Sequence, residues 1–359
     1  MRIKPIAAAL ATATALVLAG CATNETGAAP GTSAPGAQTL SGKGASSMKA
    51  AQEKWVADFQ TANTGVTVNY SPDGSGAGRS AFIAGAVQFA GSDRPFKDEE
   101  MGAGKFATCA PESNALNLPV YISPIAVVFN VDGVDSLTLD PDTVAGIFAG
   151  RITKWNDPAI ARTNPGAKLP EANITAVHRA DDSGTTNNFT DTLNQLAPDV
   201  WTEEASDTWP ASMGGEAATG TSGVVQAVKN GKNTIGYADA SQAGDLGMAE
   251  LLIGGEPLGP TAAAAAAVVD ASPQVSGRSE HDLALTLDRT SEGVYPAVLV
   301  SYAIVCETYK NAAEAALVKD YIGYITSAEG QQAAADSAGA APLSAATQAK
   351  VKAAVDSIK

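Results

Sequence analysis

The chain has 359 residues, 45% hydrophobic and 17% charged, which is enough for the cores of two domains of ordinary size. Its 23 Lys and Arg residues against 38 Asp and Glu residues give a formal net charge of -15, which argues against a nucleic-acid-binding surface because such surfaces are basic. The two histidines, His178 and His281, belong to no cluster of His, Cys and carboxylate residues at ligand spacing, so the sequence predicts neither a metal site nor a cofactor.

The first residues are typical of an export signal. Arg2 and Lys4 precede an apolar run over 6–18, and the run ends at Leu18-Ala19-Gly20-Cys21. This layout predicts a secretory signal peptide over residues 1–20. The last four residues resemble a bacterial lipobox, whose cysteine is acylated; the alternative is an ordinary signal peptide followed by a chance cysteine. We expect a protein anchored to the outer face of the cytoplasmic membrane by lipidated Cys21, with 21–40 as a flexible tether of small and polar residues.

The remaining sequence alternates helix-like and strand-like segments, which predicts an α/β fold with parallel or mixed sheets. The expected helices cover 47–61, a short stretch near 82–86, a segment that begins at Asp140-Pro141 and is stopped by Gly150, and the stretches 189–196, 224–228, 262–267 and 317–325. The expected strands cover 66–70, 87–90, 174–177, 234–237 and 297–305.

Polar, glycine-containing turns recur before the expected helices. They are 41–47, 73–78, 91–93 and 178–186. In the last of them Arg179 precedes a helix start, where unpaired amides and the helix dipole favour an oxyanion. One such turn alone is better explained by a helix cap and a surface arginine. Four of them predict a shared oxyanion site, because ligands in α/β folds lie beyond the carboxyl ends of strands.

Enzymatic interpretations of the same turns find little support. Gly74-x-Gly76-x-Gly78 differs from the G-x-G-x-x-G spacing of dinucleotide-binding turns, and no lysine lies where a P-loop needs one. No G-x-S-x-G elbow is present, and His178 is the one histidine near these motifs. The sequence therefore predicts a binding protein and no enzyme.

Two cysteines remain after Cys21. Cys109 and Cys306 would lie in an oxidising compartment after export, so an even pair predicts one disulfide. Two buried free thiols are the alternative that the sequence leaves open.

Several motifs in the same order resemble those of a known family. They are Gly42-x-Gly44-Ala45-Ser46, Asn69-Tyr70 with Gly74-Ser75-Gly76, Phe89-x-Gly91-Ser92-Asp93, the run GRITKWNDPAI over 150–160, Asn164-Pro165-Gly166, Arg179-Ala180-Asp181-x-Ser183-Gly184-Thr185, and Gly236-Tyr237. Over about 41–305 the chain resembles the phosphate-binding lipoproteins of bacterial phosphate-specific ABC importers.

The resemblance implies a two-lobed type II periplasmic-binding-protein fold, with the ligand in the cleft between the lobes. Lobe I would combine 41–121 with 296–359, and lobe II would be 122–295. The chain would bind inorganic phosphate and deliver it to ABC transporter permease subunits, as a monomer held at the membrane by its lipid. The alternatives are a binding protein for another tetrahedral oxyanion (arsenate, sulfate or molybdate) and a surface protein with weak phosphatase activity.

The resemblance also implies roles for individual residues, and the phosphate contacts would be the Ser46 hydroxyl, the Ser47 amide, the Ser75 hydroxyl, Arg179, and the helix start at Ser183, Gly184 and Thr185. Asp181 would hold Arg179. The chain departs from the family pattern at Ser47-Met48, which replace an aromatic-proline pair, and at Asp182, where glycine is frequent. Arg94 is a further departure, and we expect it to pair with Asp93.

Asp93 carries the expected selectivity. A carboxylate beside a bound anion repels it unless the anion brings a proton to share. Phosphate carries a P–OH group that donates to Asp93, whereas sulfate at neutral pH has none, and a site whose buried acceptor goes unpaired rejects the analogue without the donor. Arsenate has the same proton and shape as phosphate and would compete.

Overall fold

The computed structural model describes residues 38–291 and 293–359. The predicted signal peptide, Cys21 and most of the predicted tether lie outside the described residues. Residues 38–40 of that tether belong to strand β1 (Gln38–Gly44), where Leu40 is fully buried and pairs with Val68. The tether prediction was therefore a few residues too long.

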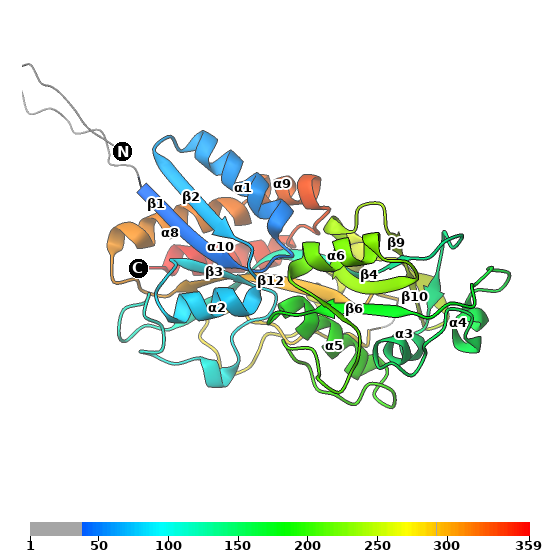
Figure 1. The fold of residues 1–359 in the computed structure, drawn as a ribbon. Helices are drawn as coiled ribbons and strands as arrows, with labels where there is room; N and C mark the ends of the chain where they lie inside the picture. The colour runs from blue at the N-terminus through cyan, green and yellow to red at the C-terminus, as the bar shows by residue number, and fades with distance from the viewer. Residues whose placement is uncertain (1–37, 292) are drawn as a thin grey trace, which may run out of the picture. The chain divides into compact units, whose positions relative to one another are not determined.

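One sheet of nine strands organises the described chain (Figure 1). Its order is β2 (Val66–Ser71), β1, β3 (Phe89–Ser92), β12 (Val298–Cys306), β4 (Ala115–Asn130), β8 (Thr234–Asp239), β6 (Thr175–Arg179) and β7 (Glu216–Ala218), with β9 (Gly247–Met248) also paired to β4. A smaller sheet has the order β11 (Glu256–Leu258), β10 (Glu250–Ile253) and β5 (Thr138–Leu139). Parallel pairs such as β1–β2 and β6–β8 stand beside antiparallel pairs around β4 and β12, so the sheet is mixed, as predicted.

The long strand β4 joins the two halves of the main sheet. Its residues up to Pro124 pair with β12, and those from Ile125 on pair with β8. We call the half around β1, β2 and β3 lobe I and the half around β6, β7 and β8 lobe II. The resemblance placed the lobe boundary at 121/122, a few residues before this change of partner. Its other boundary, at 295/296, lies just before β12.

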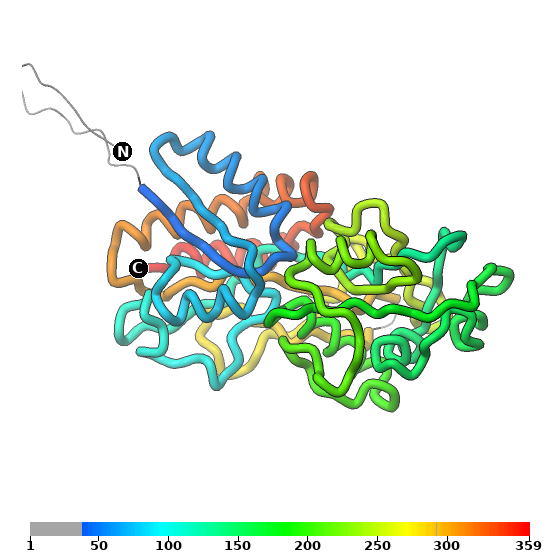
Figure 2. The backbone as a smooth tube through the Cα atoms, viewed as in Figure 1, coloured from blue at the N-terminus to red at the C-terminus, as the bar shows by residue number. Residues whose placement is uncertain are grey.

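Helices from both ends of the chain cover lobe I. They are α1 (Lys49–Ala62), α2 (Ser75–Ile83), the 3-10 turn η1 (Asp98–Glu100), α8 (Ala312–Thr326), α9 (Ala328–Ala338) and α10 (Ala345–Ser357). Trp55 of α1 is fully buried, and its indole N–H donates to the Gly330 carbonyl of α9. Figure 2 shows the blue N-terminal and orange to red C-terminal segments side by side in this lobe.

Lobe II carries α3 (Pro141–Phe148), α4 (Pro158–Thr163), α5 (Gly184–Leu196), α6 (Gly220–Asn230) and the 3-10 turn η2 (Ala240–Gln242). The Asp140 side chain accepts from the Thr143 amide and Pro141 occupies the first turn, so α3 begins as predicted. Helix α7 (Ala262–Ala271) packs against β4 and β12.

The four expected turns lie partly in regular structure, since 91–92 end β3, 178–179 end β6 and 184–186 begin α5. Residues 41–44 belong to β1, and 75–78 form the first turn of α2. The glycines there allow close packing: a Cβ on Gly44 would lie 1.9 Å from the Gly91 carbonyl oxygen, and one on Gly78 would lie 2.6 Å from Gly44 Cα. Helix α2 ends at Ile83, so the short helix expected near 82–86 begins earlier than predicted and does not reach Ala86.

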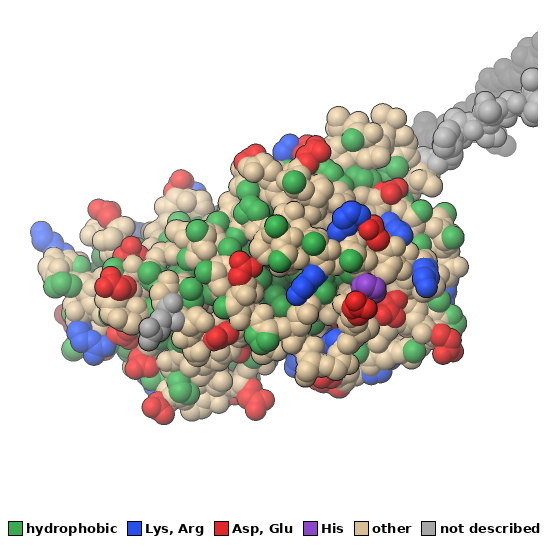
Figure 3. Space-filling model, turned by 180° about the vertical axis from the view of Figure 1, so that it is seen from behind, with side chains coloured by type: hydrophobic (Ala, Val, Ile, Leu, Met, Phe, Trp, Pro, Cys, Tyr) green, Lys and Arg blue, Asp and Glu red, His purple; other side chains and the backbone are tan. Residues whose placement is uncertain are grey.

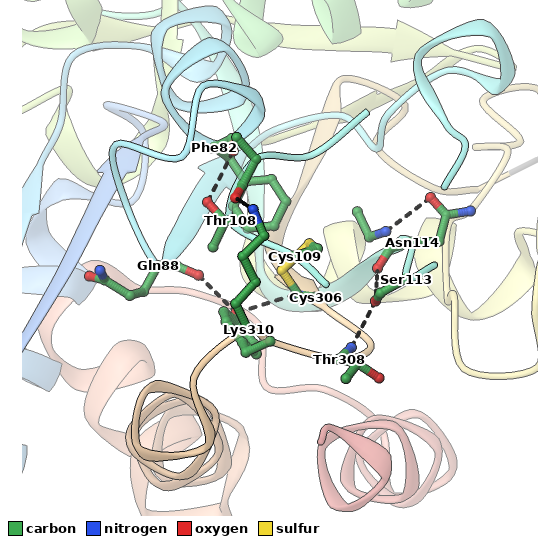
Figure 4. The surroundings of a disulfide bond; sticks show 12 residues. Phe82, Gln88, Thr108, Cys109, Ser113, Asn114, Cys306, Thr308 and Lys310 are labelled. Atoms are coloured by element: carbon green, nitrogen blue, oxygen red, sulfur yellow. Dashed lines mark hydrogen bonds between the residues drawn. A yellow bond between two sulfur atoms is a disulfide. The ribbon is translucent and has the colours of Figure 1, made fainter. Parts of the chain in front are cut away.

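A disulfide joins Cys109 to Cys306 across 197 positions of sequence (Figure 4). Cys109 lies in the loop before β4, and Cys306 ends β12. Beside it the Thr308 amide donates to Ser113 Oγ at 2.8 Å. The structure thus has the bonded one of the two alternatives that the sequence left open, and the bridge lies within lobe I.

Within residues 38–291 and 293–359, no helix is long and apolar enough to span a bilayer. Acidic and basic side chains are interspersed over the face shown in Figure 3.

Candidate functional site

Lobe II contributes the start of α5 and the arginine before it. β6 ends at Arg179, and the Ser183 side chain caps α5 by accepting from the Thr186 amide at 3.1 Å. The side chains of Arg179 and Ser183 are buried. The first-turn amides of α5 therefore point away from the helix at its N-terminus, the end that favours negative charge.

Asp181 holds the Arg179 guanidinium. Arg179 Nε and Nη2 donate to the two Asp181 oxygens at 2.8 and 2.5 Å, and the Gly220 amide donates to Asp181 Oδ1 at 2.9 Å. Burial raises the pKa of Asp181, but the hydrogen bond and charge of Arg179 outweigh it and leave that pKa below its usual value. Asp181 thus fixes the position of the Arg179 guanidinium, whose Nη2 would lie 3.6 Å from a Cβ on Gly74 of lobe I.

Lobe I contributes the starts of α1 and α2 and the loop after β3. Ser46 and Ser47 precede α1, Ser75 opens α2, and Asp93 follows β3. These four side chains are buried. Ser75 Oγ accepts from the Asp93 amide at 3.1 Å, so its own O–H remains able to donate.

The Asp93 carboxylate accepts three side-chain hydrogen bonds. Ser47 and Ser301 donate to Oδ1 at 2.6 and 2.8 Å, and Thr185 donates to Oδ2 at 3.0 Å. Burial raises the pKa of Asp93, while these hydroxyls and the charge of Arg179 lower it, and burial is the larger effect. The Asn188 amide of α5 also donates to the Asp93 carbonyl at 2.6 Å.

The lobes touch around this cluster. The Thr221 amide of α6 donates to Ser46 Oγ at 3.1 Å, and the Gly76 amide of α2 donates to the Asp182 carbonyl at 3.0 Å. A Cβ on Gly184 would lie 2.7 Å from both Asp93 Cβ and Ser75 Oγ. The cleft between the lobes is therefore closed, and glycine is needed at 184 for that approach.

Arg94 does not pair with Asp93, so that expectation was wrong. Arg94 Nη1 donates to Glu100 at 2.7 Å, and its Nε and Nη2 donate to Asp207 of lobe II at 2.9 and 2.8 Å. Burial lowers the pKa of Arg94, but these two carboxylates raise it well above its usual value. The Asp93 carboxylate accepts from three hydroxyls instead of from Arg94.

The structure brings every predicted contact residue to this region: Ser46, Ser47, Ser75, Asp93, Arg179, Ser183, Gly184 and Thr185. The Asp182 departure is accommodated, because its carbonyl accepts from Gly76 and its side chain accepts from Thr208. His178 packs away, with its ring stacked on Trp209 at a centroid distance of 4.8 Å.

Sequence reasoning missed three residues here: Ser301, Asn188 and Asp207. Ser301 is a polar residue in the otherwise apolar or aromatic strand Val298–Cys306, a signal that was available. No comparable signal marks Asn188 or Asp207. Among the described residues, no group of three or more His, Cys, Asp or Glu side chains is arranged to hold a metal ion.

Comparison with known proteins gives the chain its relatives. The family model of the PBP superfamily domain matches residues 29–329. Phosphate-binding protein PstS 3 of Mycobacterium tuberculosis is 36% identical over 325 residues, covering 86% of each chain. Phosphate-binding protein PstS 2 of the same species is 34% identical over 369 residues, covering 98% of each.

Solved structures share the fold. A high affinity periplasmic phosphate-binding protein (PfluDING) bound with phosphate superposes with a TM-score of 0.72 at 24% identity, covering 88% of this chain and 93% of that one. A putative phosphate ABC transporter substrate-binding protein from Clostridium perfringens has a TM-score of 0.61 at 18% identity, covering 85% and 100%. The predicted two-lobed fold is confirmed. The chain belongs to the PBP superfamily and, within it, to the family of the PstS phosphate-binding proteins.

Proposed function

We propose that this chain is an extracytoplasmic receptor that binds inorganic phosphate and delivers it to the permease of an ABC transporter. The observation that carries the proposal is the contact between the binding residues of lobe I and those of lobe II. The amide-bearing start of α5, next to Arg179, lies directly against Ser75 and Asp93 of the other lobe. The PstS relatives give independent support.

Residues of both lobes contact the anion in this proposal. Arg179, fixed by Asp181, pairs with phosphate oxygens, and Ser183, Gly184 and Thr185 donate from the start of α5. From lobe I the hydroxyls of Ser46 and Ser75 and the amide of Ser47 donate. Because both lobes contact the ligand, binding favours the closed arrangement over an open one.

Asp93 determines which oxyanions the site binds. Its carboxylate accepts the P–OH proton of phosphate, and a fully ionised anion would face it with no proton to share. Arg179 and the helix amides hold any tetrahedral oxyanion, so selectivity rests on Asp93. We expect phosphate and arsenate to bind and sulfate and molybdate to be rejected.

Export and membrane anchoring belong to the same proposal. Cys21 is the acylated residue, which anchors a monomeric receptor to the outer face of the cytoplasmic membrane beside its permease. The receptor binds without turnover. No observation on the described residues favours a phosphatase, and His178 stacks on Trp209 with its Nδ1 2.9 Å from the Arg179 carbonyl.

Calorimetric titration of the purified protein with phosphate, arsenate, sulfate and molybdate tests the proposal. Heat of binding with phosphate and arsenate alone is the expected result. Binding of sulfate as tight as that of phosphate, or no binding of phosphate, would overturn it.

Asp93→Asn tests the basis of selectivity. Asparagine keeps the shape of the side chain and offers an N–H donor, so sulfate gains a partner and phosphate loses an acceptor. We expect the preference for phosphate over sulfate, about 10⁴-fold or more in comparable sites, to fall steeply. An unchanged preference in the same titration would contradict the role of Asp93.

A further inference from the structure

Two hydroxyl groups at the site have no place among the proposed phosphate contacts. They are the side chains of Ser47 and Ser301, both 0% exposed. Each donates to the same oxygen, Oδ1 of Asp93, at 2.6 and 2.8 Å. The oxygen Oδ2 accepts one hydroxyl, from Thr185 of the opposite lobe, and is the one available to a ligand proton.

Ser47 and Ser301 come from elements that are far apart in the sequence. Ser47 precedes α1, and Ser301 lies 208 positions from Asp93 on β12. Beside Ser301 the register of β12 shifts: Ser301 pairs with Tyr121 and Tyr302 pairs with Pro119, so Val120 bulges from β4. The bulge therefore lies in the partner strand, next to the pairing position of Ser301, and bulges are frequent near binding sites.

Three hydroxyl donors around one carboxylate favour its ionised form. An ionised carboxylate only accepts hydrogen bonds, whereas a protonated carboxyl has to donate one and gives up part of its accepting capacity. A protonated Asp93 would also present a hydrogen to the ligand. The site would then accept an anion that has no proton of its own.

We propose that the side chains of Ser47 and Ser301 are positioning residues for selectivity, which hold Asp93 as a pure acceptor so that the site excludes anions that carry no proton. This inference rests on the proposed function, because it concerns the same phosphate site.

The surrounding charges act on Asp93 in opposite directions. Arg179 lowers the pKa of Asp93, and burial raises it. Two further groups feel its charge, the buried carboxylate of Asp239 at the end of β8 and the half-buried Tyr70 on β2. The neighbouring Arg94 is paired with Asp207 and Glu100. None of these four groups hydrogen-bonds to the side chain of Ser47 or Ser301, so replacing the serines removes two donors to Asp93 and leaves the charges around it in place.

The test compares the wild type with the double variant Ser47→Ala/Ser301→Ala by calorimetry with phosphate and with sulfate. Titrations at about pH 5 and about pH 8 bracket the range in which a destabilised carboxylate takes up a proton. Sulfate keeps its charge over this range, so any change in its binding reports on the protein. We expect the wild type to reject sulfate at both pH values. In the double variant sulfate should bind at least about tenfold more tightly at the lower pH than at the higher one.

The control is Ser113→Ala, which removes another buried hydroxyl of lobe I, beside the disulfide, and should behave as the wild type. Ser301→Cys keeps the shape and weakens the donor, and near-UV circular dichroism checks that each variant is folded. If the double variant does not fold, Ser47→Ala and Ser301→Cys carry the test, with the same direction expected.

The outcomes separate the two proposals. A wild type that binds no phosphate overturns both. A wild type that binds phosphate and rejects sulfate, together with folded variants that still reject sulfate at the lower pH, overturns the role of the serines alone. Equal loss of phosphate binding at both pH values without a gain of sulfate also overturns it, since that marks a merely structural role.

Discussion

Contacts with Asp93 show how single residues can be placed by distant elements. Ser47 stands before one helix, Thr185 in the first turn of another and Ser301 within a strand, yet all three hydroxyls converge on one carboxylate. The close approach of Gly184 makes this convergence possible. The residue with no side chain is therefore as specific a requirement as those that donate.

Gly184→Ala tests that requirement. The new Cβ would meet Asp93 and Ser75 at 2.7 Å, so the closed arrangement is overpacked by about 1–3 kcal/mol. We expect phosphate affinity to fall by about 5- to 150-fold, measured by calorimetry.

The matched control is Gly223→Ala on α6, whose Cβ would have its nearest neighbours at 3.7 Å, an ordinary contact. It should bind phosphate as the wild type does. A Gly184→Ala protein of undiminished affinity would show that binding does not need this approach of the lobes.

Among the elements, the helices that begin at the cleft were the best predicted. The strand–turn–helix pattern that ends in Arg179 and α5 is local: Ser183 caps the helix three residues from its partner amide. Asp140-Pro141 marks α3 by the same local chemistry. Periodicity and caps are encoded within a few residues, so a single sequence reveals them.

The elements that sequence reasoning misread depend on distant partners. The glycines of β1 resemble those of a turn, but they are needed for close packing between distant segments. A Cβ on Gly42 would clash with Phe89, and one on Gly44 would clash with Gly91. The Ser301–Asp93 bond and the Arg94–Asp207 pair span 208 and 113 positions, and no local pattern encodes them. The same lack of local signal explains why Arg94 was assigned to its neighbour Asp93.

The junction of β4 and β8 holds a buried acid with a consequence for pH. Asp239, paired with Ile125 in the ladder, is 0% exposed and accepts hydrogen bonds from Tyr121 and Ser241. Burial raises the pKa of Asp239 to about 7 from the usual 3.8, and the charge of Asp93 adds to the rise. The folded protein therefore binds this proton more tightly than the unfolded chain does.

The sign of the effect follows from that difference. The stabilising contribution is complete below about pH 4 and is lost as pH rises toward about 7, by up to about 1.4 kcal/mol per pH unit. We expect Asp239→Asn to flatten this part of the profile in denaturant unfolding without phosphate. Asp270→Asn, at an exposed acid of α7, should leave it unchanged. Identical slopes for wild type and Asp239→Asn would exclude this acid as the cause.

On the scale of the whole molecule, closure is reinforced by a buried ion-pair cluster between the lobes. Asp207 of lobe II accepts from Arg79 at 2.5 Å and from Arg94 at 2.8 Å, and both arginines are at most 8% exposed. Opening would return these charges to water. Closure of the cleft therefore goes together with formation of these ion pairs between the lobes.

Asp207→Asn should therefore weaken ligand binding. Removing one partner of a buried pair costs about 3–5 kcal/mol, and the cost falls on the closed arrangement. We expect phosphate affinity to drop by about 100-fold or more. Asp199→Asn, at an exposed acid of the same lobe, serves as control. Equal affinities of the two variants in calorimetry would contradict the account.

The disulfide should stabilise the fold without touching the site. Cys109 and Cys306 enclose a long loop, so reduction or Cys109→Ala/Cys306→Ala should lower the free energy of unfolding by about 2–5 kcal/mol. Phosphate affinity should remain as in the wild type, because the bridge lies within lobe I. Denaturant unfolding and calorimetry on the same samples check both halves, and a large loss of affinity in a folded variant would refute the second.

The place of β12 between β3 and β4 has a consequence for how the molecule comes into being. The first three strands of lobe I emerge early in synthesis, yet the strand that must lie beside them is Val298–Cys306. Cys109 likewise cannot form its disulfide until Cys306 has been synthesised. A nascent chain therefore cannot complete even its first lobe until most of its residues have been added. The chain therefore remains unfolded for most of its synthesis, and an unfolded chain is the form that can pass through a narrow secretion channel.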